Sequence, residues 1–452
     1  MGAPKDESIL PCLRIERMAY GADAIAHDDG GRVVFVSGGV PGDVVDVRVT
    51  QEKGRFAHGT VKSVVKASPF RVDVPHPYVE QCGGCPWANL AYEAQLTAKR
   101  ANVTDALVRI GRFPQERAEA LVATCVASPK PWGYRNKIEL AVATQQGRTT
   151  IGMHDRLGRG IATFRGCPLL DPRHDTFARS IVGALSYLTG TRELGLERVA
   201  IRASTRTSEI EVALWTRPGG FPRGQVAKVL SDATKGQATS IVRVLTKGPR
   251  GARRVIGVER LLGRGSWSER VGKERMRLSA PSFFQVNTKG AEVLVDLVMG
   301  GLSPTEDEVA MDLYSGVGTF TLPLARRTSW VSAVESSGPA VRDLRRNLEG
   351  AGLDDVDVIG GDANREFPTG GADIIVVDPP RAGLAQEVVE KLSDQRARAI
   401  VYVSCDPATL ARDLARFKEA GSFSPLVITP VDLFPQTFHV ETVCLMSRVE
   451  GK

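Results

Sequence analysis

Apolar residues in the last part of the chain come in short runs, and each run ends at a glycine turn, an acid or a proline. Such runs are typical of strands in a parallel sheet that is buried on both faces. The first leads through Gly316 and Gly318 into a segment that reads as the start of a helix. The runs therefore predict one α/β domain, with strands near residues 309–313, 330–334, 356–359, 373–377 and 399–403.

The earlier part of the chain has a different pattern. Residues 32–36 and 44–49 read as two strands separated by glycine and proline turns. Helical spacing of apolar residues runs from Tyr92 to Phe113, and alternating residues at 210–215 indicate a strand. A further helix, predicted over 287–298, opens the α/β domain.

Acids and glycines follow the predicted strands of the α/β domain. Gly316 and Gly318 would let the backbone pass close to a ligand. Glu335 ends the second strand, where a carboxylate holds a ribose diol in nucleotide-binding folds. Asp362 and Asp378 follow the next two strands. Together these residues predict a nucleotide-cofactor site.

A cysteine and a glutamate near the C-terminus suggest covalent chemistry. Cys405 comes soon after the apolar run 399–403, and Glu441 follows from another short turn. A thiol at the carboxyl end of a strand, with an acid nearby, is a candidate pair of nucleophile and proton acceptor. A lone cysteine is more often a small core residue, so this interpretation depends on the cofactor site upstream.

The motifs DLYSGVGTF, AVE, GDA, DPPRAG, SCDPATLARDL and FPQTFHVETV, with SFFQVN at 282–287, occur in this order along the chain. The set resembles the S-adenosylmethionine-dependent RNA uracil-5-methyltransferase family. The resemblance extends to the N-terminus and implies a multidomain α/β protein. It implies a small oligonucleotide-binding-type β-barrel (a TRAM domain) over 1–67, a central α+β domain over 68–270 and a Rossmann-like class I methyltransferase domain over 271–452.

The resemblance implies transfer of a methyl group from S-adenosylmethionine to carbon 5 of an extruded uridine in RNA. Carbon 5 is a poor nucleophile until a thiolate adds to carbon 6. The implied roles are Cys405 as that nucleophile and Glu441 as the base, with His439 as a structural or supporting residue. The residues implied to bind the cofactor are Gln285, Tyr314, Gly316, Glu335, Asp362 and Asp378.

Two alternatives to this activity remain open from the sequence. One is an RNA-binding protein with a vestigial methyltransferase fold, although such a protein has no chemical reason to keep Cys405 and Glu441. The other is a cytosine-5 RNA methyltransferase, which usually has a cysteine in the DPP-type loop; residues 378–381 contain none. For the substrate, the N-terminal barrel favours ribosomal RNA over transfer RNA.

A cysteine motif in the central part resembles the one that holds a four-iron, four-sulfur cluster in many family members. Here it consists of Cys82, Cys85 and Cys167, and His76 stands where those members have a further cysteine. Thiolates are the usual ligands of such clusters, and imidazole replaces them in some centres. Three alternatives remain: an iron–sulfur cluster, a structural zinc ion with the same ligands, or no metal.

Composition agrees with an RNA partner. The 452 residues include 59 Lys and Arg against 52 Asp and Glu, a formal net charge of +7. A mildly basic chain suits a polyanion. The sequence has neither a long apolar stretch nor an apolar signal core at its start, so we expect a cytoplasmic protein without membrane contact. Seven unevenly spaced cysteines do not form a disulfide framework. We expect a monomer without an obligate protein partner.

Overall fold

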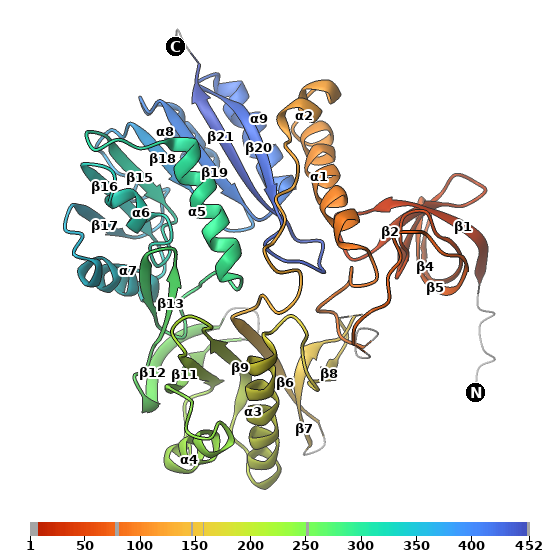
Figure 1. The fold of residues 1–452 in the computed structure, drawn as a ribbon, viewed down its shortest axis with the longest axis horizontal. Coiled ribbons are helices and arrows are strands. Elements are labelled where there is room, and N and C mark those ends of the chain that lie inside the picture. The colour runs from red at the N-terminus through yellow and green to blue at the C-terminus, as the bar shows by residue number, and fades with distance from the viewer. Residues whose placement is uncertain (1–7, 77–80, 146–147, 157, 250–252, 450–452) are drawn as a thin grey trace.

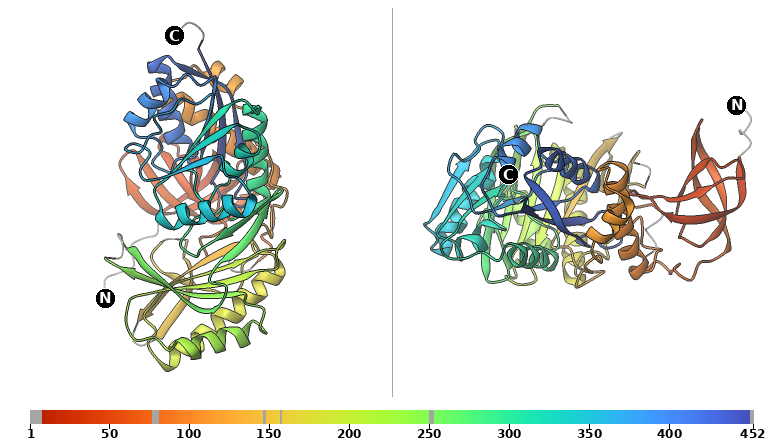
Figure 2. Two further views of the ribbon diagram at one scale, coloured as in Figure 1. Left: turned by 90° about the vertical axis from the view of Figure 1, so that its left-hand side faces the viewer. Right: turned by 90° about the horizontal axis from the view of Figure 1, so that it is seen from above.

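The computed structural model describes residues 8–76, 81–145, 148–156, 158–249 and 253–449. Figure 1 shows three bodies: a barrel at one side, a helix-covered sheet below, and a larger layered α/β unit above. Figure 2 shows that the barrel stands out from the other two. No helix among the described residues is both long and apolar enough to cross a membrane.

The first body is a closed five-stranded barrel, as predicted. Its strands pair in the order β1-β2-β3-β5-β4, and β1 closes the barrel on β4. Alternate residues face inward, as with Val45 and Val47 of β4, because successive side chains of a strand point to opposite faces. The strands are β1 (Ile9–Met18), β2 (Ala24–His27), β3 (Val33–Ser37), β4 (Val44–Lys53) and β5 (Phe56–Lys66).

The second body is a seven-stranded sheet in the order β12-β11-β10-β9-β6-β7-β8. Among its described strand pairs, β10 and β11 alone are parallel, so the sheet is mainly antiparallel and fits the predicted α+β class. The strands are β6 (Lys137–Gln145), β7 (Arg148–His154), β8 (Ile161–Thr163), β9 (Leu196–Ala203), β10 (Ile210–Thr216), β11 (Ser240–Lys247) and β12 (Arg254–Gly263). Two helices, α3 (Pro172–Thr191) and α4 (Arg223–Ala233), bury their apolar stripes against this sheet.

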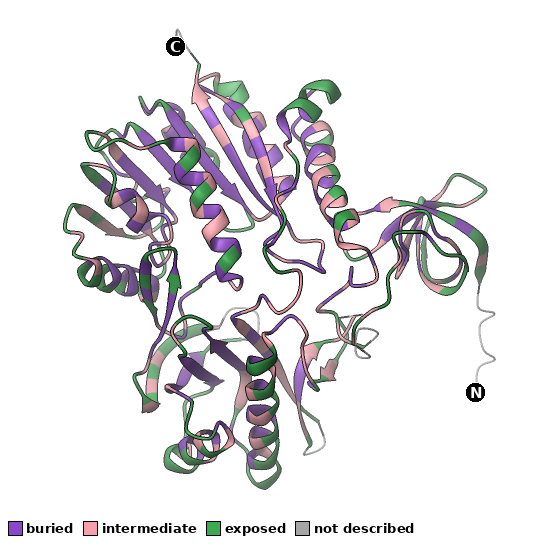
Figure 3. Ribbon diagram, viewed as in Figure 1, coloured by how far each residue is buried: buried purple, intermediate pink, exposed green. Residues whose placement is uncertain are grey.

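The third body is a Rossmann-like sheet in the order β17-β16-β15-β18-β19-β21-β20. The first five strands are parallel and β21 runs antiparallel between β19 and β20. Figure 3 shows that the middle strands are almost wholly buried, which is why they read as unbroken apolar runs. The strands are β15 (Val309–Leu313), β16 (Trp330–Glu335), β17 (Val356–Gly360), β18 (Ile374–Val377), β19 (Ala399–Ser404), β20 (Phe423–Val431) and β21 (Glu441–Arg448).

Helices and a hairpin surround this sheet. The predicted helix over 287–298 is α5, and the side chain of Asn287 caps it by accepting a hydrogen bond from the backbone N–H of Gly290. The remaining elements are the hairpin β13 (Trp267–Val271) and β14 (Glu274–Leu278), and the helices α5 (Thr288–Leu302), α6 (Thr321–Ala325), α7 (Gly338–Ala351), α8 (Gln386–Ser393) and α9 (Pro407–Ala420).

Two helices that precede the central sheet pack on the Rossmann-like sheet instead. These are α1 (Tyr92–Arg109) and α2 (Gln115–Leu121). Val103 and Leu107 of α1 share one apolar cluster with Leu414 of α9. The division at residues 68 and 271 stays a prediction; within it, this helical pair contributes to the core of the third body.

Candidate active site

The predicted site residues meet at one edge of the Rossmann-like sheet. Parallel pairing of β15, β16, β17, β18 and β19 brings their carboxyl ends together. Because β21 is antiparallel to β19, with Ser404 opposite Thr442, its first residue Glu441 lies beside the end of β19. Strand β19, which Cys405 follows, is the second strand from β15, and two strand spacings of roughly 4.8 Å place the two strands about 10 Å apart.

The turn after β15 has the backbone geometry that a bound ligand requires. Tyr314, Gly316 and Gly318 all have positive φ, and a Cβ added at Gly316 would meet open space. Glu335 holds the turn through its carboxylate, which accepts hydrogen bonds from the backbone N–H of Gly316 at 2.9 Å and of Ser337 at 2.5 Å. The carboxylate is thus fixed at the edge where a ribose would bind.

Central-domain residues position the segment that contains Gln285. The side chain of Asn136 donates to the backbone carbonyl of Gln285 at 2.9 Å, and the Arg202 guanidinium donates to the carbonyls of Ser279 at 3.0 Å and Ser282 at 2.5 Å. Gln285 is buried, and its side-chain oxygen has no hydrogen-bond partner among the residues that the structure describes. A buried acceptor without a donor fits a site that a ligand completes.

The nucleophile candidate lies between a buried strand and a capped helix. Cys405 is half-buried directly after β19, and Asp406 caps α9 by accepting hydrogen bonds from the N–H groups of Ala408 at 2.9 Å and Thr409 at 3.1 Å. This arrangement fixes the backbone on both sides of the thiol. Burial, followed by the charges of Glu441 and Asp378, raises the pKa of Cys405 to about 11.

Two carboxyl groups near the thiol, those of Glu441 and Asp378, have raised pKa values. Burial and then the charge of Asp378 raise the pKa of Glu441 well above its ordinary value. Burial, then Asp312 and Glu335, raise the pKa of Asp378 to about 7. Carboxyl groups with raised pKa values are typical of proton-transfer sites.

Arg381 opposes this negative charge, and sequence reasoning gave it no role. Its charge lowers the pKa of both Cys405 and Glu441, while its guanidinium lies 3.4 Å from Nδ1 of His439. Burial and then Arg381 lower the pKa of His439 to about 4, so its imidazole is neutral and a weak base. This supports Glu441, rather than His439, as the proton acceptor.

Tyr20 was also missed, because it belongs to the barrel. It lies in the β1–β2 loop, its hydroxyl is 3.4 Å from the carbonyl oxygen of Cys405, and its ring meets the edge of Phe438 at 5.8 Å. Burial, followed by the charges of Asp406 and Cys405, raises the pKa of its hydroxyl. Nothing in the local sequence around residue 20 indicates this contact.

The barrel is fastened to the loop that leads to Glu441. Trp87, fully buried, packs with the barrel core and with Phe438, and its indole N–H donates to the carbonyl of Gly21 at 3.0 Å. The backbone N–H of Trp87 donates to the carbonyl of Gln436 at 3.1 Å. The side chain of Gln95 then exchanges two hydrogen bonds of 2.9 Å with Gln436.

Comparisons with known proteins agree with this architecture. The tRNA (uracil-5-)-methyltransferase profile matches residues 269–370 and 371–449, and the TRAM domain profile matches residues 13–62. An uncharacterised RNA methyltransferase of Gloeobacter violaceus is 36% identical, over 96% of this chain and 95% of its own. The chain belongs to the tRNA (uracil-5-)-methyltransferase family.

Other relatives match over the same span. An uncharacterised RNA methyltransferase of Thermosynechococcus vestitus is 34% identical, over 96% of this chain and 97% of its own. The structure of the Pyrococcus abyssi tRNA (uracil-54, C5)-methyltransferase with S-adenosyl-L-homocysteine matches with a TM-score of 0.74 and 28% identity, covering 96% of this chain and 99% of that one. The chain is thus an S-adenosylmethionine-dependent RNA methyltransferase with a TRAM barrel, as the motifs predicted.

The carboxyl edge of this enzyme fits S-adenosylmethionine. The open turn at Gly316, the fixed carboxylate of Glu335 and the unpartnered oxygen of Gln285 lie on the elements that surround this edge. Asp362 follows β17, and its charge acts on Tyr314, whose pKa is raised to about 12 chiefly by burial. The assignment of individual residues to parts of the cofactor stays a prediction.

The cysteine motif belongs to the segments that precede and follow the first strands of the central sheet. Cys85 and Cys167 pack in one small cluster with Tyr134, and His76 lines a cavity of about 720 Å³ together with Cys167. Within the described ranges, no group of three or more His, Cys, Asp or Glu side chains is arranged to hold a metal ion. The metal ligands named from the sequence stay a prediction.

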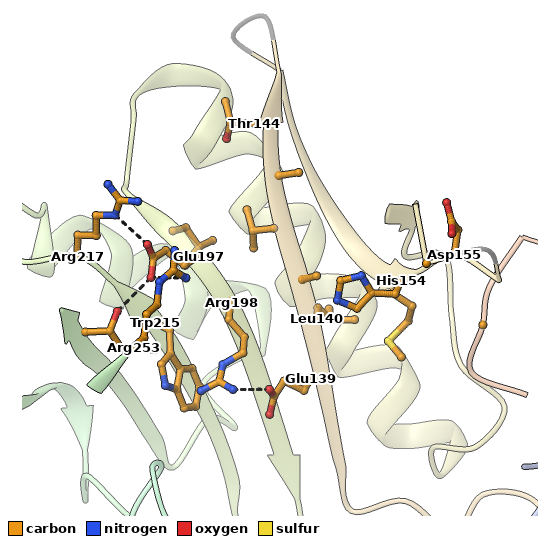
Figure 4. Close-up of a pocket in the computed structure, with 18 of the residues that line it drawn as sticks. Glu139, Leu140, Thr144, His154, Asp155, Glu197, Arg198, Trp215, Arg217 and Arg253 are labelled. Carbon is orange, nitrogen blue, oxygen red and sulfur yellow. Dashed lines mark hydrogen bonds and ion pairs between the residues drawn. The ribbon is translucent and has the colours of Figure 1, made fainter. Parts of the chain in front are cut away.

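A cavity of about 1190 Å³ lies on the central sheet rather than at Cys405 (Figure 4). Its lining includes Trp215, whose ring carries the Arg198 guanidinium at 4.1 Å, and Arg198 in turn donates to Glu139 at 2.6 Å. Glu197 similarly holds Arg217 at 2.9 Å and Arg253 at 2.8 Å. Its size alone does not make it the catalytic site, because its lining does not include Cys405 or the carboxyl groups of Glu441 and Asp378, whose pKa values are raised.

Proposed function

We propose that this enzyme methylates carbon 5 of a uridine in RNA through a covalent bond between Cys405 and carbon 6. The observation that carries the proposal is the register of β19 and β21. It brings the only half-buried thiol at the described carboxyl edge beside the buried Glu441, about two strands from the cofactor turn. Nucleophile, base and methyl donor would then surround one pyrimidine ring.

The proposed reaction begins and ends with the Cys405 thiolate. The Cys405 thiolate adds to carbon 6, and the electrons of the ring's C5–C6 double bond move toward oxygen 4. S-adenosylmethionine supplies an electrophilic methyl group on a sulfonium sulfur. Carbon 5 attacks that methyl group, and the cofactor leaves as its neutral thioether. The Glu441 carboxylate then removes the proton from carbon 5, the double bond re-forms, and the bond from sulfur to carbon 6 breaks.

Charge at the site supports this order of events. The raised pKa of Cys405 means that its thiol loses a proton reluctantly in the free protein. Arg381 lowers this pKa, and a sulfonium cation nearby would act in the same direction. Binding of the cofactor before the RNA therefore favours the thiolate. The raised pKa of Glu441 likewise means that its carboxylate, once ionised, is a comparatively strong base.

The test uses two variants and one control. Cys405→Ala should lose methylation of total RNA by labelled cofactor, whereas Glu441→Gln should accumulate a protein–RNA adduct that survives denaturing electrophoresis. Cys12→Ala, which changes an exposed barrel cysteine, should behave as wild type. Full turnover by Cys405→Ala would exclude the covalent route, and labelled 5-methylcytidine as the product would exclude uridine.

The RNA class is the second part of the proposal. The N-terminal barrel favours ribosomal RNA, and the match over nearly the whole chain to a transfer-RNA enzyme from Pyrococcus abyssi makes transfer RNA the second candidate. Mapping of 5-methyluridine in both RNA pools of a deletion strain decides between them. Loss from the ribosomal pool alone supports the first candidate, and loss from the transfer-RNA pool alone supports the second.

We also propose that the enzyme is a monomer and that it is located in the cytoplasm.

The cysteine motif leads to a separate proposal of a structural cluster. The thiols of Cys82, Cys85 and Cys167 and the imidazole of His76 are of the donor types that iron–sulfur clusters or zinc accept, and Cys167 lies in one cluster with Cys85 and lines one cavity with His76. Metal analysis and an absorption spectrum of anaerobically purified enzyme separate the alternatives. A brown protein with iron and acid-labile sulfide supports the cluster, colourless protein with zinc supports a zinc site, and neither metal excludes both.

A further inference from the structure

A cleft lined by four arginines lies on the side of the methyltransferase domain that is remote from the barrel. It has a volume of about 420 Å³ and is bounded by the hairpin β13–β14 and by α7. The lining contains no aspartate or glutamate among the described residues. Figure 1 shows β13 and α7 on the opposite side of the molecule from the barrel strands. Its main lining residues are Arg264, Arg275, Arg277, Arg346, Ser268 and Asn347.

Two buried carboxylates accept hydrogen bonds from the exposed arginines of the cleft. Glu209 accepts hydrogen bonds from Arg264 at 2.7 Å and Arg275 at 3.2 Å; its side chain is 5% exposed, whereas each arginine is 61% exposed. Asp343, 1% exposed, accepts from Arg346, which is 44% exposed, at 2.9 Å. The anions are therefore hidden, and the cations face solvent.

The arrangement leaves donors and positive charge in excess. Each guanidinium has five N–H donors, and the contacts of Arg264 with Glu209 and of Arg346 with Asp343 each use one. Four arginines against the two buried carboxylates give 4 − 2 = +2 for the cleft. Cations that repel one another in a cleft are stabilised by an anion with several oxygens. Phosphate matches the guanidinium fork in geometry as well as charge.

The hairpin is fixed rather than loosely placed, so the arginines are held in position. The backbone N–H of Arg277 donates to the Asn347 side-chain oxygen at 2.8 Å, and the side chain of Arg277 donates to Ser266 at 2.7 Å. The Asn347 amide donates in turn to the carbonyl of Val317, in the cofactor turn, at 3.0 Å. The cleft and the cofactor turn are thus two sides of one packed layer.

We infer that this arginine cleft binds backbone phosphates of the RNA substrate, at nucleotides outside the loop that holds the target uridine. The inference rests on the proposed function, because it takes the anion from the same RNA. An RNA that reaches Cys405 and the barrel on one side must continue around the domain to reach the cleft. The cleft therefore selects for a folded RNA over an isolated stem-loop, through contacts that carry no base sequence.

The test compares two RNA lengths. The variant is Arg264→Gln/Arg346→Gln, which leaves Arg275 on Glu209. The control is Arg223→Gln/Arg173→Gln, which removes two arginines that are 61% and 72% exposed and also paired with acids. Both are assayed with fluorescein-labelled transcripts of the complete RNA in which methylation is mapped and of the stem-loop that contains its target. Melting temperature and cofactor affinity confirm that each variant is folded.

The cleft variant should bind the complete RNA about tenfold more weakly, with a salt slope smaller by about 1.4–1.8 for two lost phosphate contacts. Its affinity for the stem-loop, and the control's affinity for both, should stay unchanged. Arg264→Lys/Arg346→Lys should restore most of the affinity, because the charge remains. If the control variant loses as much affinity for the complete RNA, the effect reflects only the overall positive charge of the protein. If the cleft variant binds the complete RNA as tightly as wild type, the cleft is not a phosphate-binding site for RNA.

A free anion is the other source of phosphate chemistry. If sodium tripolyphosphate raises the melting temperature of wild type but not of the cleft variant, and RNA affinity is unchanged, the cleft is an inorganic-anion site and the inference is overturned. A wild type that binds RNA through the cleft but methylates neither transcript would instead contradict the proposed function alone.

Discussion

A buried ion pair between α1 and the loop before the catalytic acid gives a quantitative test of the packing. Lys99 and Asp432 are both fully buried, and the Lys99 ammonium donates to Asp432 and, at 3.1 Å, to the carbonyl of Phe434. The second carboxylate oxygen of Asp432 has no hydrogen-bond partner among the described residues. Burial lowers the pKa of Lys99 and outweighs the attraction of Asp432, so desolvation is the dominant effect on this charge.

Lys99→Met should therefore be strongly destabilising, since it leaves a buried carboxylate without its cation. Breaking such a pair costs about 3–5 kcal/mol. At roughly 2–4 °C per kcal/mol for a unit of this size, the melting temperature should fall by about 6–20 °C. Replacing both partners, as in Lys99→Met/Asp432→Leu, removes the desolvation cost on both sides and should recover most of the loss.

Thermal unfolding followed by tryptophan fluorescence measures these changes. Arg17→Met is the control: it breaks an ion pair with Asp105 at 3.0 Å in which the side chains are 42% and 44% exposed. Exposed pairs contribute about 0–1 kcal/mol, so this variant should melt close to wild type. The reasoning is refuted if Lys99→Met melts like the control, or if the double variant melts as low as the single one.

Three further predictions concern catalysis. The single-turnover rate of methyl transfer should keep rising as the pH is raised from 6 to 8, because Cys405 and Glu441 must lose protons that their raised pKa values retain; a flat profile over this range would contradict this. Tyr20→Ala should lower kcat about tenfold or more through loss of its packing on Phe438, whereas Tyr20→Phe should keep most activity; equal losses in steady-state assays would argue against packing. Gly318→Ala should abolish cofactor binding measured by calorimetry, because its φ is +101° and the new Cβ would lie 2.4 Å from Leu322.

The sequence predicted the methyltransferase edge well, for a physical reason. Parallel strands place their carboxyl ends together, so Glu335, Asp378 and Cys405 had to lie at one edge once their strands were identified. The apolar runs were readable because these strands are buried on both faces. Glu441 required only the further fact that β21 is antiparallel to β19.

Contacts between distant segments were not predictable in this way. Helical spacing identified α1, but an apolar stripe does not name the surface that it covers, so its packing against α9 was missed. The hydrogen bonds between Gln95 and Gln436 join residues 341 apart in sequence. One signal was available: Gln95, Lys99 and Asn102 are polar residues on the same face of α1, and a buried polar face indicates a polar partner.

The docking of Trp87 and Tyr20 has a consequence for how the enzyme comes into being. A ribosome releases the barrel well before the Phe438 segment, yet each completes the other's packing. Catalytic competence must therefore await synthesis of the segment around Phe438, however early the barrel folds. For the same reason the barrel cannot simply be replaced by the barrel of another protein. The replacement would need a β1–β2 loop with a tyrosine at the position of Tyr20 as well as the RNA-binding strands.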